Sequence, residues 1–210
     1  ADVGDPCPPD LPAHAHADCL SFELAVDGRR LAVDSGTSTY EAGDQRSYER
    51  STAAHNTVSV DGADQTEVWA TFRAARLARS RLEHAADDGR TVTVVASHDG
   101  YRRLPGAPKH RRTWHVDAGV LEISDEVSGR GRHRVQSRLH LAYRDGFQLF
   151  WAGPSELVVT EQAGTHATEF GRLHNGHIVT ATWIGALPTF IRTKLHISHL
   201  PPIPHTGADA

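Results

Sequence analysis

Apolar and polar residues alternate along much of the chain with a period of two. Leu20, Phe22, Leu24 and Val26 form one such series. Successive side chains of an extended strand point to opposite faces, so this alternation is typical of strands with one buried face. Helical periodicity is nearly absent. The pattern therefore predicts an all-β fold.

Asp-Gly pairs separate the alternating segments, and such pairs supply the positive φ that tight hairpin turns require. They stand at residues 27–28, 61–62, 88–89, 99–100 and 145–146. We expect strands at 20–26, 31–34, 56–60, 76–84, 90–97, 109–116, 120–127, 133–143, 147–151, 156–160, 177–184 and 190–198. About twelve short strands in one domain predict a large antiparallel β-sandwich of two packed sheets; a β-barrel is the alternative arrangement.

Two stretches depart from the strand pattern. Between Gln65 and Ala75, the residues Val68, Trp69 and Phe72 fall three to four positions apart, which allows a helix; a loop with buried aromatic side chains fits equally. The stretch 201–210 is rich in Pro and Gly and is expected to be a flexible tail.

Length and composition narrow the class of protein. The 210 residues suffice for one β-rich domain, which we place at 1–200. No apolar run is long enough to span a membrane, and with a net charge of −4 and scattered Lys and Arg no nucleic-acid surface is indicated. The chain begins without Met, so we expect a piece of a longer protein. Cys7 and Cys19 do not fix a compartment; a periplasmic or secreted location is favoured.

Histidine is abundant, with 15 residues, and some of it is placed as metal ligands are. His14, His16 and Asp18 stand at alternate positions, and Asp34 and His55 follow. Two His and one carboxylate with an open position form the ligand set of a water-binding Zn²⁺ site and also of a non-haem Fe(II) site. The spacing alone leaves a metal and an ordinary hydrogen-bonded cluster about equally supported.

Four linked blocks of sequence resemble the heparinase II/III-like family of bacterial polysaccharide lyases. They are HAHADCLSFEL from His14, VDSGT from Val33 with Tyr40 after it, RSTAAHNTV from Arg50, and VDG from Val60. The resemblance is close over roughly the first 75 residues. It implies a carboxy-terminal β-sandwich that packs against an amino-terminal α/α toroid, with the active site in the cleft between them.

The resemblance also assigns roles to individual residues. It makes His16, Asp34 and His55 the ligands of a zinc ion. His14 would face the cleft as a catalytic residue, and Tyr40 would be the catalytic tyrosine. Arg50 and Asn56 would lie near the substrate and help to bind it.

The implied activity is β-elimination on an acidic, uronate-containing polysaccharide. A base takes the proton beside the carboxylate, and an acid protonates the leaving oxygen. His14 and Tyr40 are the candidates in this chain, and the resemblance assigns the other catalytic groups to the toroid. The 210 residues alone are therefore expected to be nearly inactive. Heparan sulfate, alginate and other uronates all remain possible substrates.

Two alternatives remain open. The first is a non-catalytic glycan-binding or structural β-sandwich stabilised by a metal. The second is an Fe(II) oxygenase-like double-stranded β-helix that uses His16 and Asp18 as ligands.

The spacing of the proposed zinc ligands raises a geometric difficulty. In a regular hairpin with Val26 opposite Leu31, Asp34 lies opposite Glu23, and seven residues of straight strand would then separate it from His16 by ~23 Å. The zinc assignment therefore requires a bend, a bulge or another register before Leu20.

Overall fold

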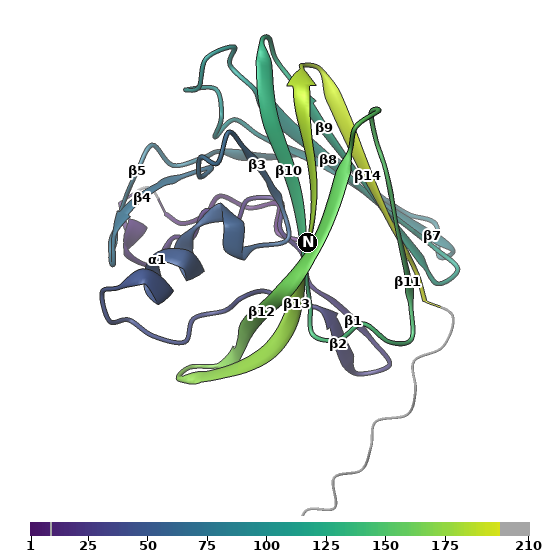
Figure 1. Cartoon of the computed structure of the whole chain (residues 1–210), viewed down its shortest axis with the longest axis horizontal. Coiled ribbons are helices and arrows are strands. Elements are labelled where there is room, and N and C mark those ends of the chain that lie inside the picture. The colour runs from purple at the N-terminus through teal and green to yellow at the C-terminus, as the bar shows by residue number, and fades with distance from the viewer. Residues whose placement is uncertain (9, 198–210) are drawn as a thin grey trace, which may run out of the picture.

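Two antiparallel sheets packed face to face form the body of the protein, as the computed structural model shows for residues 1–8 and 10–197 (Figure 1). The first sheet has the order β1-β2-β10-β13-β12, with β3 paired to β10. Its strands are β1 (Leu24–Val26), β2 (Arg29–Ala32), β3 (Val58–Val60), β10 (Arg132–Leu141), β12 (Val158–Glu169) and β13 (Arg172–Ala186).

The second sheet has the order β11-β14-β9-β8-β7-β6. Its strands are β6 (Ser80–Asp87), β7 (Thr91–His98), β8 (Lys109–Asp117), β9 (Val120–Ser128), β11 (Gln148–Ala152) and β14 (Thr189–His196). The predicted all-β sandwich is confirmed, and each of the twelve expected strands has a counterpart. No described helix is long and apolar enough to cross a bilayer.

The core lies between the two sheets and follows from the period-two pattern. In β14 every second residue is buried, from Thr189 through Ile191 to Leu195. In β10 the inward positions include Val135 and Leu139, which meet the second sheet in two adjoining apolar clusters. Removing these side chains from water supplies the main driving force for closing the sandwich.

The segment 65–75 is neither a helix nor a loop with buried aromatic residues. It forms a small hairpin of β4 (Glu67–Ala70) and β5 (Arg73–Ala75), in which Trp69 is 61% exposed and Phe72 is 46% exposed. The two aromatic side chains point outward: Phe72 belongs to the exposed aromatic cluster described below, and Trp69 packs against the guanidinium of Arg73. The predicted tail at 201–210 lies outside the described residues.

Short helices cover one side of the sandwich, next to β3 and the small hairpin (Figure 1). They are η1 (Pro12–His14), α1 (Asp44–Arg50) and η2 (Thr52–Ala54). No helix was predicted for any of these segments. They are too short for the 3.6-residue period to show, and α1 has no side-chain cap at its N-terminus.

A buried ion pair links the second sheet to the segments on which these helices lie. The guanidinium of Arg112 donates to Asp125 through Nε at 2.6 Å and Nη2 at 2.9 Å, and both residues are 1% exposed. Its Nη1 donates to the backbone carbonyls of Leu20 and Asn56. One side chain thereby holds two distant stretches of backbone against the second sheet.

We expect Asp125→Asn to destabilise the fold by roughly 3–5 kcal/mol, because the Arg112 charge would remain buried without its partner. Denaturant unfolding measures this loss. Asp117→Asn is the matched control, since Asp117 is exposed at the end of β8, and it should stay within about 0.5 kcal/mol of the parent.

The same pair predicts an acid dependence. Burial alone would raise the Asp125 pKa, but Arg112 and the hydrogen bond with His110 outweigh it and hold the pKa below its usual range. Such a group stabilises the fold fully above its unfolded pKa of ~3.9 and loses that contribution as the pH falls toward the folded pKa. The unfolding free energy should therefore fall below about pH 4 in the parent and less steeply in Asp125→Asn; equal slopes would contradict the assignment.

Candidate functional site

Three segments that are distant in the sequence meet at one end of the first sheet. They bring His16, Asp34 and His55 together. Nδ1 of His55 lies 2.6 Å from Oδ2 of Asp34, and the rings of His16 and His55 are 5.4 Å apart between centroids. His55 is fully buried, whereas the Asp34 side chain is 25% exposed.

His16 and Asp34 can approach each other because the chain turns before β1 and the register of β1 and β2 differs from the expected one. The backbone N–H of Ser21 donates to the Asp18 carbonyl at 2.9 Å, and Leu20 adopts a positive φ of 61°, so the chain turns sharply between His16 and β1. The hairpin register expected from sequence is wrong, because Val26 pairs with Arg29 across the turn at residues 27–28. A bulge also lies between Leu24 and Ala25.

Gly36 fixes the position of Asp34. The Gly36 N–H donates to Oδ1 of Asp34 at 2.8 Å, and Gly36 has a φ of +71°. A Cβ at this position would lie 2.4 Å from the carbonyl oxygen of Ala167, so a larger residue would push the loop away from β12. Only glycine combines this backbone conformation with this close approach.

The Asn56 side chain ties the three segments to one another. Its Nδ2 donates to the carbonyls of Phe22 at 2.8 Å and Val33 at 2.9 Å, and its Oδ1 accepts the His140 N–H at 2.6 Å. These hydrogen bonds are buried, so replacing Asn56 would leave two backbone carbonyls and one N–H without partners.

The cluster is strongly polarised. Burial opposes a charge on His55, yet the Asp34 carboxylate and its hydrogen bond raise the pKa of His55 to about 9. Burial, together with the charges of His55 and Arg46, lowers the pKa of His16 to about 3. His16 is thus a neutral imidazole at pH 7, the form that can bind a metal ion.

Arg46 connects this cluster to the aromatic surface beside it, and sequence reasoning missed it. Its Nη1 lies 3.3 Å from Nε2 of His16, and its guanidinium carbon lies 5.2 Å from the centre of the Tyr40 ring. Arg46 comes from α1, a helix that was not predicted, and no motif marked it.

An exposed aromatic cluster lies beside Arg46, which it meets through Tyr40. The His14 ring lies 5.7 Å from that of Tyr40 and 6.0 Å from that of Phe72, and Tyr40 lies 5.1 Å from Phe170. Tyr40 is 45% exposed and Phe170 62% exposed. The two residues predicted to be catalytic are therefore adjacent on an open surface.

Arg50 and Asn56, which the resemblance placed near the substrate, make mainly structural contacts within this domain. Both are fully buried. The guanidinium of Arg50 donates to the backbone carbonyls of Ala15 and Ala70. Neither side chain has surface to offer a glycan in this arrangement, and their contacts position the loops that carry the histidines.

The residues around His55 suit a metal ion in donor type but are not spaced as a complete ligand set. No group of three or more His, Cys, Asp or Glu side chains among residues 1–8 and 10–197 is arranged to hold an ion. The Nε2 atom of His55 is nevertheless buried without a hydrogen-bond partner. Because tetrahedral zinc holds ligand atoms about 3.3 Å apart, the 2.6 Å contact of His55 with Asp34 would have to widen if both bound through these atoms.

The fold and this cluster define a β-sandwich domain with a histidine-rich site at one end. The family described as heparinase II/III-like, C-terminal, matches residues 1–189, and the chain belongs to this family. The family assignment leaves the Fe(II) oxygenase alternative without support. Asp18, its proposed ligand, lies in the turn before β1.

Curated relatives and solved structures are similar to the chain. It is 32% identical over 123 residues to a heparin-sulfate lyase of Bacteroides stercoris, covering 55% of this chain and 16% of that protein. It is 29% identical over 177 residues to a heparin-sulfate lyase of Bacteroides thetaiotaomicron, covering 81% and 22%. A heparinase III structure superposes with a TM-score of 0.71 at 23% identity, covering 87% of this chain and 30% of that one.

A heparan sulfate lyase from Pedobacter heparinus has the same fold, with a TM-score of 0.66 at 17% identity over 90% of this chain and 32% of that one. The chain thus spans between about a sixth and a third of the length of these relatives.

The role of Asn56 can be tested through stability. Asn56→Ala should lower the free energy of unfolding by roughly 2–4 kcal/mol, because two carbonyls and one N–H would be left buried without partners. Urea unfolding measures the change, with the exposed Asn175→Ala as control. A loss below about 1 kcal/mol would show that the three segments are held by other contacts.

Proposed function

We propose that this domain forms one wall of the active-site cleft of a polysaccharide lyase that cleaves uronate-containing glycans by β-elimination. The observation that carries the proposal is the exposed His14–Tyr40 pair beside the partly buried His16–Asp34–His55 cluster. The names of the similar proteins support the reaction class.

This surface would supply some of the catalytic groups, and the opposite wall of the cleft would supply the others. His14 or Tyr40 would take the proton beside the substrate carboxylate, and the other would protonate the leaving oxygen. Arg46 places a positive charge 5.2 Å from the centre of the Tyr40 ring. Aromatic faces of Tyr40, Phe72 and Phe170 would pack against sugar rings.

We also propose that His16, Asp34 and His55 hold a zinc ion beside this surface. A zinc ion bound there would supply a positive charge that fixes the three loops together, and the elimination itself would be left to the exposed groups. The convergence of the three side chains and the neutral imidazole of His16 support this proposal, and zinc binding would release the proton from His55.

In the full-length protein, His14→Ala and Tyr40→Phe should each lower turnover about 10²- to 10⁴-fold while the unfolding transition stays in place. Ultraviolet absorbance of the 4,5-unsaturated product measures turnover on heparan sulfate and on alginate. His84→Ala, which removes an exposed imidazole on β6, should have no effect. Unchanged turnover in both variants would favour a scaffold or glycan-binding role.

Elemental analysis tests the metal. Protein purified without added metal should contain about one zinc per chain, and Asp34→Ala should lose it while Asp18→Ala keeps it. The reverse pattern, or iron in place of zinc, would refute the proposed ligand set.

The 210 residues alone are proposed to be nearly inactive, because one wall of a cleft supplies only part of the catalytic groups. Rapid release of unsaturated product by this chain alone would overturn that part of the proposal.

A further inference from the structure

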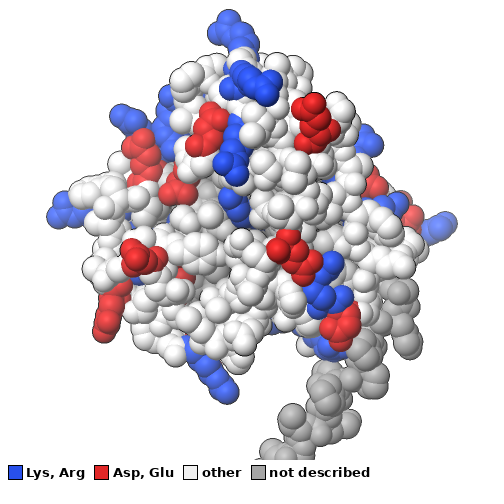
Figure 2. All heavy atoms as spheres, in the orientation of Figure 1, with Lys and Arg blue, Asp and Glu red and all other residues white. Residues whose placement is uncertain are grey.

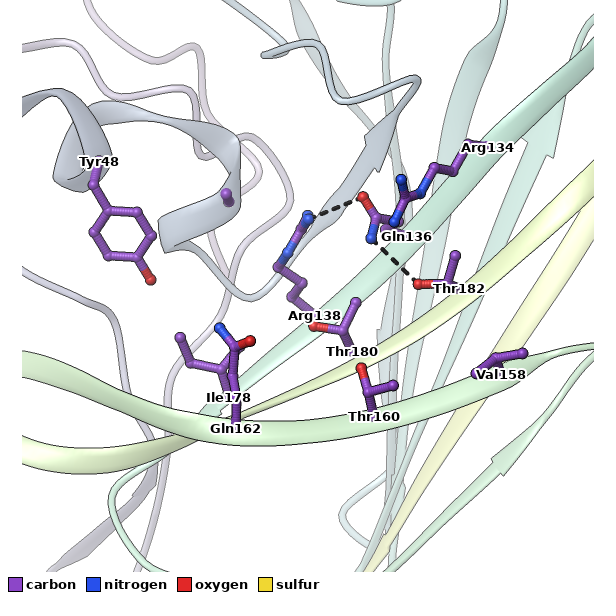
Figure 3. Close-up of a pocket in the computed structure, with 11 residues that line it drawn as sticks. Tyr48, Arg134, Gln136, Arg138, Val158, Thr160, Gln162, Ile178, Thr180 and Thr182 are labelled. Carbon is purple, nitrogen blue, oxygen red and sulfur yellow. Dashed lines mark hydrogen bonds between the residues drawn. The ribbon is translucent and has the colours of Figure 1, made fainter. Parts of the chain in front are cut away.

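A polar groove lies on the outer face of the first sheet beneath α1, and the functions considered so far do not use it. It has a volume of about 460 Å³. Figure 3 shows Tyr48 reaching toward it from α1, while the other labelled side chains rise from β10, β12 and β13. Arg138 pairs with Thr180, and Thr180 with Thr160, in the strand register. Directly opposed residues of antiparallel strands share a face, so these side chains form a row across the groove.

The groove is cationic at its floor. Arg134 and Arg138 both line it, and in the described part of the chain its lining includes no Asp or Glu. Arg138 donates through Nη1 to Ser59 at 2.7 Å and through Nη2 to Gln136 at 3.1 Å, so neutral groups hold its guanidinium in place, and no carboxylate of the described residues forms an ion pair with it. A partly buried arginine with no carboxylate partner suits an anionic ligand.

This positive charge is local. The chain has a net charge of −4, and Figure 2 shows charges of both signs scattered over the face that contains α1 and β12. General attraction of polyanions to the surface is therefore not expected. Hydroxyl and amide groups alternate with the guanidinium groups along the groove, as recognition of a polyhydroxylated anion requires.

The groove continues toward the proposed catalytic surface. A second hollow of about 390 Å³ lies beside it and is lined by Thr165 and Asn175 of the β12–β13 hairpin. The two hollows share Tyr48, Gln162 and Ile178. Phe170 lies in the turn of the same hairpin, 5.1 Å from the Tyr40 ring. A polymer lying in the groove would therefore run along this hairpin in the direction of Tyr40.

We propose that this groove binds an anionic stretch of the glycan chain, with Arg134 and Arg138 contacting sulfate or carboxylate groups of sugars remote from the bond that is cleaved. The proposal rests on the lyase function proposed above and specifies how this domain would recognise the substrate.

The test measures binding without cleavage. Full-length protein carrying His14→Ala is titrated calorimetrically with a heparin-derived hexasaccharide, with its desulfated form and with a neutral hexasaccharide. Arg134→Ala and Arg138→Gln should each weaken binding roughly tenfold, as expected for one lost charge-assisted contact. Arg192→Ala removes an exposed arginine from the second sheet and should change binding less than twofold. Arg134 is exposed, so its variant remains informative if Arg138→Gln fails to fold.

The arms separate the possible outcomes. If the arginine variants lose affinity for both the sulfated and the desulfated hexasaccharide, the arginines bind carboxylates. If they lose affinity for the sulfated form alone, the arginines bind sulfates. Both results support the groove. Equal affinity for the neutral hexasaccharide, or unchanged binding in both arginine variants, overturns it. If the parent protein cleaves heparan sulfate while the arginine variants bind normally, the lyase function stands and the groove is refuted.

The accessibility of the groove is tested separately. A Thr160→Cys side chain that fails to react with a charged thiol reagent would show the groove covered by another part of the protein, which also refutes it.

Discussion

The geometry of the candidate site depends on the buried side chain of Asn56. Its amide holds the backbone of Phe22 and Val33 and accepts the N–H of His140. His55 directly precedes Asn56 in the chain, and the segments of Phe22 and Val33 lead to His16 and Asp34. An amide has the donors and the acceptor that these contacts require, and a carboxylate of the same shape would set an acceptor against two carbonyls. The site is therefore fixed by hydrogen bonds before any metal or substrate is considered.

Arg112 performs the corresponding function from the other sheet. It is buried against Asp125 and donates to the carbonyls of Leu20 and Asn56, so the turn after His16 and the segment after His55 are fastened to the sandwich. His110 and Ser137 complete the bonding of the Asp125 carboxylate, which leaves few unsatisfied groups at the pair. A fully bonded network of this kind specifies one arrangement of the loops, whereas apolar packing alone would tolerate several.

The sequence predicted the regular parts of the fold and the residues with a recognisable motif. Each of the twelve large-sheet strands lies where the period-two pattern and the turn residues predicted one, and four of the five Asp-Gly glycines have the positive φ that was expected. β12 and β13 are longer than predicted, since their far ends leave the sandwich and carry no apolar alternation. Trp69 and Phe72 were placed wrongly for a related reason: apolar spacing cannot distinguish a core from an exposed aromatic surface. The roles of Arg46 and Asn56 depend on long-range contacts that no local pattern encodes.

The helix α1 shows why these long-range contacts matter for function. A helix turns by about 100° per residue, so Arg46 and Tyr48, two positions apart, leave it in nearly opposite directions. Arg46 reaches His16 and Tyr40, and Tyr48 lies over the groove, where its hydroxyl is 3.3 Å from Nε2 of His140. Seven residues are too few for a stable isolated helix. Its position is instead set by buried Glu49, which accepts hydrogen bonds from Gln45 and from the Ser38 N–H of the Asp34 loop, both at 2.9 Å. The loop after Asp34 thus positions both the carboxylate of the histidine cluster and the helix α1, which lies between that cluster and the groove. A displacement of the loop or of α1 would therefore change the geometry of the cluster and of the groove together.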